Sequence, residues 1–424
     1  MKISEAFHLM VKSTGAICNL DCTYCFYLEK EKLYVRNKEW KMSGEVLESY
    51  VKQYIESQKT PVITFSWQGG EPILLGVEFF KQAVLLQKKY SNGKKIENTF
   101  QTNGVLLNDE WCDFFKENNF LIGLSIDGPE ELHNKYRLYK GGQLSFEKVM
   151  NGLRFLQKHN VEFNTLTCVQ RDNSYQPREV YNFLKEIGST FLQFIPIAER
   201  EAVNKNEMLS LVSPDYKDKA IVTDWSVEPL QFGKFLTTIF DEWVRKDVGK
   251  YFVQIFDVAL EIWYTGQASL CIFKDTCGRA MAIEHNGDIY SCDHFVYPEN
   301  KLGNLMEESL SKIVDSDQQV KFGNDKKNTL PKYCRECEVR FACNGECPKH
   351  RFIKTPDGED GLNYLCAGYK YFFNYINPYM NFMVTQLKQQ LPPANVMAWT
   401  NEKDNGFPAS KAGRNDNPAA AHRS

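Results

Sequence analysis

The sequence contains no long apolar run. Its first residues, MKISEAFHLMVKSTG, lack the hydrophobic stretch of a signal peptide, and no later segment approaches the length of a transmembrane helix. The lack of a signal peptide and of a transmembrane run predicts a soluble, cytoplasmic protein that does not bind a membrane. Internal repeats are absent as well.

Excess charge of either sign is also missing. The chain has 51 Lys and Arg against 54 Asp and Glu, a formal net charge of -3. This balance argues against the strongly basic surface of a nucleic-acid-binding protein. Histidines are few, and they show no spacing typical of metal ligands. The remaining composition, with 43% hydrophobic residues in 424, allows a large core and two or three domains.

Cysteine, by contrast, is plentiful. The chain has 13 cysteines, and in a cytoplasmic protein such a number indicates metal binding more often than disulfides. The odd count also argues against a closed set of disulfides. We therefore expect most of these thiols to be metal ligands.

Between residues 7 and 198, short apolar runs alternate with helical patterns. The runs are rich in β-branched and aromatic residues, whereas segments such as GVEFFKQAVLLQKKY space their apolar residues by three and four. This alternation predicts parallel β/α units, and six units suggest an incomplete barrel. We expect strands at residues 7–13, 62–68, 97–103, 121–127, 162–169 and 191–198. We expect helices at residues 44–58, 76–90, 108–118, 145–159 and 176–187.

The remainder of the chain divides by composition. A polar, irregular connection is expected at 199–230, one or two amphipathic helices at 232–264, a hairpin around Asn286-Gly287 and a helix at 369–390. The last stretch is small, polar and non-periodic, which is typical of disorder. The expected domains are the barrel (1–230), a helical linker (231–268), a cysteine-rich domain with a C-terminal helix (269–395) and a disordered tail (396–424).

Three cysteines follow the first expected strand directly. Cys18, Cys22 and Cys25 have the spacing C-x3-C-x2-C, whereas closed metal sites usually take four protein ligands. Three thiolates can hold three irons of a [4Fe–4S] cluster and leave the fourth free to bind S-adenosylmethionine (SAM). Cleavage of SAM by one electron then yields a 5′-deoxyadenosyl radical. The alternative is a structural zinc site with a distant fourth ligand.

The motif C-x3-C-x2-C, with an aromatic residue before the last cysteine, resembles the signature of radical SAM enzymes. GGEP at residues 69–72 matches their second motif, where the backbone receives the methionine amino group. Both motifs, and SIDGP at 125–129, fall at ends of expected strands, where a β/α barrel places its chemistry. The resemblance implies SAM contacts by Tyr24, Gly69, Gly70, Glu71, Ser125, Arg137 and Ala198. At the position of Ala198, the relatives usually have Leu.

Eight further cysteines lie in the last third of the chain, enough for two complete four-thiolate sites. Their spacing is C-x5-C-x14-C followed by C-x2-C-x5-C-x3-C-x18-C. Two zinc sites are the alternative, and spacing alone leaves the pairing open; one choice groups Cys334, Cys337, Cys343 and Cys347. Cys112 and Cys168 are left over, and we expect them to be small buried residues.

This second pattern resembles the SPASM domain of peptide-modifying radical SAM enzymes. The fold class implied is a partial (β/α)6 radical SAM barrel followed by a cysteine-rich α+β SPASM domain. With the first cluster, the chain would hold three [4Fe–4S] clusters. By the resemblance, one auxiliary cluster is ligated by Cys271, Cys277, Cys292 and Cys347. The other is ligated by Cys334, Cys337, Cys343 and Cys366.

Two segments, YSCDHFVYPENKLGN (290–304) and CNGECPKHRF (343–352), resemble anaerobic sulfatase-maturating enzymes. The resemblance implies oxidation of a Cys or Ser in a sulfatase to Cα-formylglycine, with Asp293 as general base. It implies two partners: a sulfatase polypeptide with the motif C/S-x-P-x-R, and an electron donor such as flavodoxin or ferredoxin. Which of Cys and Ser is preferred stays open.

Two other functions remain as alternatives. The first is a SPASM-type peptide maturase that forms thioether or carbon crosslinks. Such enzymes often carry a peptide-recognition domain before the barrel, for which the residues ahead of Cys18 leave little room. The second is a non-enzymatic zinc or iron–sulfur protein, which does not explain a three-cysteine motif together with GGEP.

Overall fold

A computed structural model describes residues 5–34, 40–204 and 207–406. Its N-terminal half consists of six strand–helix units, as the sequence predicts, and the six strands pair in parallel. The strands are β1 (His8–Lys12), β2 (Val62–Gln68), β3 (Lys95–Thr102), β4 (Phe120–Ser125), β5 (Phe163–Val169) and β6 (Phe191–Pro196). The main helices between them are α1 (Gly44–Ser57), α2 (Val77–Tyr90), α3 (Asp109–Glu117), α5 (Phe146–Lys158) and α6 (Pro177–Glu186).

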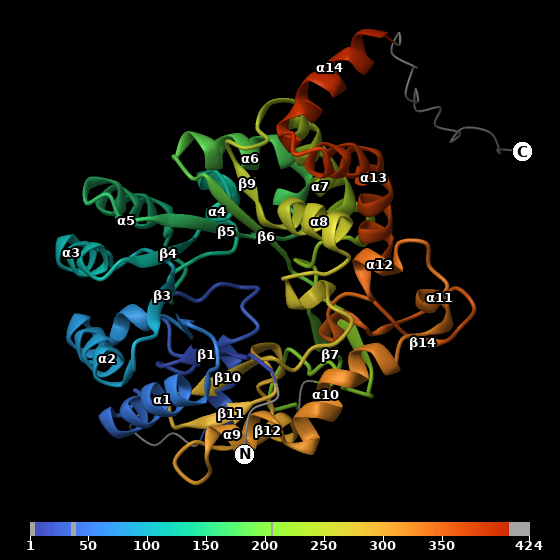
Figure 1. Cartoon of the computed structure of the whole chain (residues 1–424). Helices are drawn as coiled ribbons and strands as arrows, with labels where there is room; N and C mark the ends of the chain where they lie inside the picture. The colour runs from blue at the N-terminus through green and yellow to red at the C-terminus, as the bar shows by residue number, and fades with distance from the viewer. Residues whose placement is uncertain (1–4, 35–39, 205–206, 407–424) are drawn as a thin grey trace, which may run out of the picture.

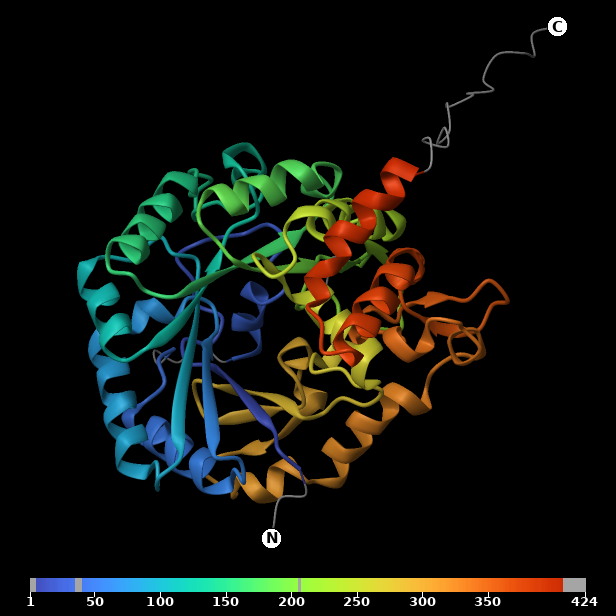
Figure 2. The same ribbon diagram turned by 45° about the horizontal axis from the view of Figure 1, so that its top comes forward.

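These helices lie on the outer side of the curved sheet (Figure 2). Their apolar faces explain the position: α3 begins at the cap Asn108, whose side chain accepts from the Trp111 amide at 3.0 Å, and it buries Trp111 and Phe115 against the strands. Cys112 lies on the same buried face and is fully buried, which confirms the prediction for this cysteine. Because the helices cover the outer side of the sheet, the functional site is expected on the inner side.

The sheet does not end with the barrel strands. It has ten strands in the order β12-β11-β10-β1-β2-β3-β4-β5-β6-β9. The additional ones are β9 (Phe252–Val253), β10 (Ala280–Glu284), β11 (Asp288–Tyr290) and β12 (Lys301–Asn304). The hairpin predicted at Asn286-Gly287 joins β10 to β11, and Gly287 has the positive φ of 87° that such a turn needs. Because β10 pairs in parallel with β1, the cysteine-rich region continues the barrel sheet (Figure 1).

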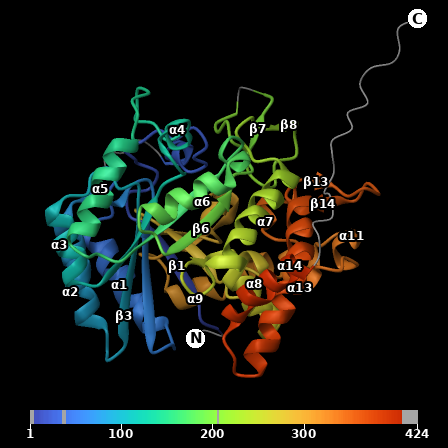
Figure 3. The same ribbon diagram turned by 90° about the horizontal axis from the view of Figure 1, so that it is seen from above.

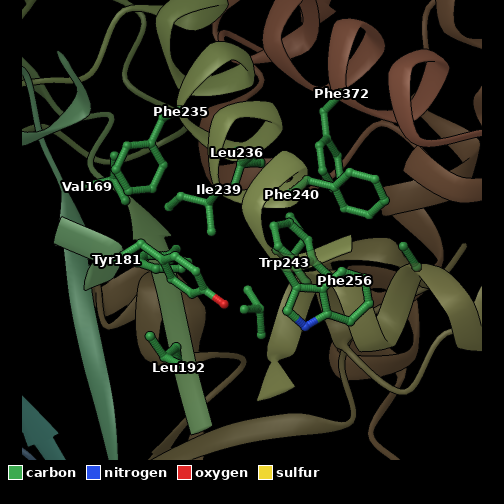
Figure 4. Close-up of a cluster of buried hydrophobic side chains, with 14 of the residues drawn as sticks. Val169, Tyr181, Leu192, Phe235, Leu236, Ile239, Phe240, Trp243, Phe256 and Phe372 are labelled. Atoms are coloured by element: carbon green, nitrogen blue, oxygen red, sulfur yellow. The ribbon is translucent and has the colours of Figure 1, made fainter. Parts of the chain in front are cut away.

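The segment expected as a linker contributes to the core. It forms α7 (Pro229–Lys246) and α8 (Gln254–Thr265), which pack with α13 (Cys366–Lys388) beside β5 and β6. Figure 4 shows Phe235, Ile239 and Phe240 of α7 in this cluster, with Phe372 of α13 close to Phe240. The middle and last thirds of the chain thus share one apolar core.

Two sequence expectations need correction. Residues 199–230 include a small hairpin, β7 (Arg200–Ala202) and β8 (Ala220–Val222), where we expected an irregular connection. The predicted disordered tail begins with a helix, α14 (Val396–Gly406), because Trp399 stacks on Phe382 of α13 at 4.6 Å and Val396 is fully buried. The rest of that tail, residues 407–424, lies outside the described residues.

The remaining helices and strands are short, and all except α4 belong to the last third of the chain. They are α4 (Glu130–Asn134), α9 (Leu310–Val314), α10 (Asp317–Asn328), α11 (Lys332–Arg335), α12 (Arg340–Cys343), β13 (Ile353–Lys354) and β14 (Asp360–Leu362). Figure 3 shows β7 and β8 on the same side of the molecule as α4.

Within the described ranges, no helix is both long and apolar enough to cross a membrane.

Candidate active site

The first three cysteines lie in a loop directly after β1. Cys18, Cys22 and Cys25 are partly buried, and the Cys25 amide donates to the Cys22 carbonyl at 2.9 Å. Burial raises the pKa of all three thiols, to about 12 for Cys18, and the neighbouring thiols raise the pKa of Cys22 further. Such thiols ionise only when a strong cation compensates them, as iron does. This donor set fits an iron–sulfur cluster.

The GGEP loop after β2 holds the cysteine loop through its backbone. The Gly70 amide donates to Gly15 at 2.7 Å, and the Glu71 amide donates to Ile17 at 2.9 Å. A Cβ at Gly70 would lie 2.0 Å from the Ile17 carbonyl oxygen, and Gly69 has a φ of 139°. Only glycine allows this approach of the two loops.

The side chain of Glu71 also joins neighbouring loops. Its carboxylate is buried and accepts from the Thr102 hydroxyl at 2.9 Å and from the Asn103 amide at 2.8 Å, both at the end of β3. Burial raises the pKa of this carboxyl to about 7. The visible role of Glu71 is therefore to join two loops; a contact with SAM stays a prediction.

A buried ion pair, Arg137 with Asp127, contacts the cysteine loop through Tyr24. The Arg137 guanidinium donates to both oxygens of Asp127, at 2.9 and 3.2 Å, and the Tyr24 hydroxyl donates to the same carboxylate. Arg137 and Asp127 are 6% and 0% exposed. Cys168, predicted to be only a small buried residue, is partly buried and lies 3.7 Å from Arg137. The structure thus brings Tyr24 and Arg137 together, through a residue that we had not singled out.

Asp127 stands two residues after Ser125 in the SIDGP motif. Its place just beyond the end of β4 is the feature of the sequence that could have identified it. The Ser125 hydroxyl accepts from Gln101 at 2.9 Å. Ala198, just beyond β6, is buried at 2% exposure. Five buried polar atoms in the loops that follow β1, β5 and β8 have no hydrogen-bond partner among the described residues: Ser13 Oγ, Thr14 Oγ1, Asn19 Nδ2, Gln170 Nε2 and Trp225 Nε1. Unsatisfied polar atoms at strand ends fit a site for a polar ligand such as SAM.

The eight cysteines of the last third separate into two sets. One comprises Cys271, Cys277, Cys292 and Cys347; burial raises their pKa values, and within the set the thiols of Cys271 and Cys347 raise that of Cys292 further. The other set lines one cavity, which Lys370 and Asn363 also line: Cys334, Cys337, Cys343 and Cys366. Cys347 is not among the described lining residues of that cavity. This placement supports the pairing implied by the SPASM resemblance.

Asp293 lies between the set that contains Cys292 and the first cysteine loop in the contacts that its turn makes. It opens the 3-10 turn Asp293–Phe295, and its carboxylate lies 3.4 Å from the Cys292 sulfur. Burial opposes its charge, but His294, Lys12 and Lys349 lower the pKa of Asp293 to about 2, so it is ionised. The His294 ring packs edge-on against Phe26, beside Cys25, at 5.3 Å. The pairing of β10 with β1 makes this contact possible.

Comparisons with known proteins agree with this geometry. The Radical SAM superfamily matches residues 13–184, and the iron–sulfur cluster-binding SPASM domain matches residues 271–338. The chain is 50% identical over 394 residues to a serine-type anaerobic sulfatase-maturating enzyme of Bacteroides thetaiotaomicron, covering 93% of this chain and 95% of the relative. It is 33% identical over 383 residues to a cysteine-type enzyme of Clostridium perfringens, covering 90% and 99%.

A solved structure described as native anSMEcpe with bound AdoMet and Kp18Cys peptide has a TM-score of 0.79 and 32% identity, covering 90% of this chain and 100% of that chain. The fold and the two cysteine regions define a radical SAM enzyme with a SPASM domain, whose cofactors are SAM and [4Fe–4S] clusters. Within that class, the chain belongs to the anaerobic sulfatase-maturating enzymes.

Proposed function

We propose that this enzyme oxidises a Ser or Cys of a sulfatase polypeptide to Cα-formylglycine. The observation that carries the proposal is the position of Asp293. Its carboxylate lies next to Cys292, and the adjacent His294 packs against Phe26 of the first cysteine loop. The target residue must lose both a Cβ hydrogen and the proton of its hydroxyl or thiol. A carboxylate between the two cysteine regions can take that proton.

For the cofactors, we propose the ligand sets implied by the resemblance. Cys18, Cys22 and Cys25 hold the SAM-binding cluster, and the two C-terminal sets hold one auxiliary cluster each. SAM is contacted by Tyr24, Gly69, Gly70, Glu71, Ser125, Arg137 and Ala198. The Arg137 guanidinium suits the methionine carboxylate, since it is held in place by Asp127. The buried thiol sets and the unsatisfied polar atoms support these assignments.

The chain's own residues have separate tasks in the reaction. When bound, SAM and the clusters supply the radical that removes the Cβ hydrogen and accept the electron that leaves the substrate. Arg137 and the GGEP backbone orient the ligand, and Asp293 receives the proton from the target oxygen or sulfur. With a Cys target, water then replaces sulfide. Full thiolate ligation of the auxiliary clusters favours electron transfer over substrate binding at those sites.

The partners follow from the same proposal. The substrate is a sulfatase segment with the motif C/S-x-P-x-R, and a serine target is favoured by the name of the relative with 50% identity. Reduction of the first cluster needs a one-electron donor such as flavodoxin or ferredoxin. We place the enzyme in the cytoplasm, where disulfides are rare and thirteen free thiols are compatible with the environment.

Mass spectrometry of two peptides tests the function. Peptides with C-x-P-x-R and S-x-P-x-R are incubated anaerobically with reconstituted enzyme, SAM and a reductant. We expect a formylglycine mass on at least one peptide, with 5′-deoxyadenosine formed in step. Asp293→Asn should keep iron content and SAM binding and lower formylglycine formation about 100-fold. Glu299→Gln, at an exposed carboxylate nearby, is the matched control.

Two outcomes contradict the proposal. Deoxyadenosine without any change in either peptide would keep the radical SAM class but indicate another peptide substrate, such as one that is crosslinked. Unchanged formylglycine formation by Asp293→Asn would remove this carboxylate from the reaction.

A further inference from the structure

Lys30 is a buried lysine whose side-chain nitrogen has no hydrogen-bond partner among the residues that the structure describes. It lies in the 3-10 helix Leu28–Leu33, which directly follows the first cysteine loop, and it is 1% exposed. Burial lowers the pKa of Lys30 to about 7, so the free protein stabilises this ammonium poorly. A buried donor without an acceptor is costly, and this one therefore indicates an acceptor that comes from outside the chain.

The Lys30 ammonium lies beside the segment that carries Asp293. It is 3.0 Å from the ring centre of Tyr297, a half-buried residue four positions after Asp293. The contact between Phe26 and His294 joins the same two segments closer to the cysteines. Four residues of chain span at most about 14 Å, and an extended substrate covers that distance in about four residues. This is the number of residues that follow the target in the motif C/S-x-P-x-R.

Two carboxylates near Lys30 are engaged by other lysines. Glu29, the preceding residue, pairs with Lys32 at 2.6 Å. Glu199, just beyond β6, is buried and pairs with Lys349. Neither accepts a hydrogen bond from the Lys30 ammonium. The place therefore has a buried positive charge in excess, which suits an oxygen acceptor and repels a second cation such as the arginine of the motif.

The proposed substrate offers one kind of acceptor whatever its variable residues are. The fixed side chains of C/S-x-P-x-R include no carboxylate, whereas every residue has a main-chain carbonyl. The proline removes one N–H and favours an extended conformation in which carbonyl oxygens are free. A lysine ammonium donates and cannot accept, so it is complementary to such a segment. We propose that Lys30 binds a main-chain carbonyl oxygen of the sulfatase segment within about four residues of the target; this inference rests on the proposed function.

A variant without the charge tests this role. Lys30→Met keeps a long side chain, and it is compared with wild type on an acetylated and amidated S-x-P-x-R peptide that contains no Asp or Glu. Because this peptide has no carboxylate, the acceptors that it offers to a buried ammonium are its carbonyl oxygens and the target hydroxyl. We expect KM for formylglycine formation to rise about tenfold, while kcat stays within about twofold and the iron content is unchanged.

Stability distinguishes a substrate-binding lysine from a structural one. A buried ammonium without an acceptor destabilises the free enzyme, so Lys30→Met should raise the midpoint of denaturant unfolding measured without peptide. A lysine that stabilises the fold would give a lower midpoint. Lys32→Met is the matched control, since Lys32 lies in the same 3-10 helix with an exposed side chain that pairs with Glu29. This control should leave KM within about twofold of wild type.

Three results would overturn the inference. An unchanged KM in Lys30→Met would remove this lysine from substrate binding. A midpoint below that of wild type, or a variant that does not fold, would make Lys30 a structural residue. A rise in KM only on a second peptide that carries a glutamate would assign a substrate carboxylate in place of the carbonyl. Wild-type enzyme that makes deoxyadenosine but no formylglycine from these peptides would instead overturn the proposed function, so the two failures are distinguishable.

Discussion

The two cysteine regions hold their thiols by different means. The first loop is fixed from outside by main-chain hydrogen bonds: Gly70 donates to Gly15, and Asp21 donates to Leu138 at 2.8 Å. The second region is held by buried charged side chains. Lys326 donates to the carbonyls of Cys271 and Ile272 at 2.8 Å each, and Arg351 donates to three carbonyls around Gly345.

This difference agrees with the ligand sets that we propose, one open and two closed. A loop fixed through its backbone leaves side-chain space on its inner face, where a ligand can complete a three-thiolate set. In the second region, Cys334, Cys337, Cys343 and Cys366 line a cavity of their own, where four thiolates can complete a set. The predictions below are ordered from the largest expected effect to the smallest.

The largest effect should follow loss of one thiol from the open set. Cys22→Ser should abolish 5′-deoxyadenosine formation, because two thiolates do not hold the cluster, while about two thirds of the iron remains in the auxiliary sites. Cys337→Ser loses a similar share of iron but should keep deoxyadenosine formation measurable. Equal loss of deoxyadenosine in both variants would show that the regions are not independent. Iron analysis and chromatography of the nucleoside provide the measurement.

Pairs of substitutions test how the closed sets are composed. Cys343→Ser with Cys347→Ser should remove both auxiliary clusters, because each thiol belongs to a different set, and leave about one third of the iron. Cys277→Ser with Cys347→Ser should remove one cluster and leave about two thirds. The reverse order of iron contents would favour the pairing of Cys334, Cys337, Cys343 and Cys347.

Gly70→Ala should disturb the open region alone. A Cβ there would be 2.0 Å from the Ile17 carbonyl, so the cysteine loop must move. We expect a loss of about 2–4 kcal/mol in the free energy of unfolding and a much slower SAM cleavage. Gly44→Ala, where a Cβ meets nothing within 4 Å, is the control. Anaerobic denaturant unfolding and deoxyadenosine formation measure the two effects, and normal SAM cleavage by Gly70→Ala would contradict this role.

The smallest effect concerns pH. Burial raises the pKa of Asp257, in α8, to about 7. The unfolded chain has the ordinary, lower pKa, so between the two values the folded state binds more protons and stability falls as pH rises. From pH 5.5 to 8, we expect a loss of about 2 kcal/mol in wild type that Asp257→Asn does not show. Denaturant unfolding at both pH values measures it; parallel pH curves would exclude a contribution of Asp257.

Much of the barrel was predictable because its signals are local. Alternating apolar runs and helical spacing predicted β2 as residues 62–68, which is its observed extent, and α1 within one residue. The three-cysteine motif and GGEP also follow from neighbours in sequence. The helix α14 was missed because its apolar residues, Val396 to Trp399, fill only one turn and form no periodic pattern; their packing against α13 stabilises the helix.

By itself, the sequence determined the β/α alternation and the positions of the two cysteine-rich regions, since both depend on residue type and spacing; the class of chemistry followed from the motifs that it shares with a known family. Only the tertiary structure decided that β10 extends the sheet at β1, that Asp127 holds Arg137, and that the His294 ring packs against Phe26. These contacts join residues from 10 to 272 positions apart. Their free energy comes from burial and charge pairing in the folded chain, which no local pattern records.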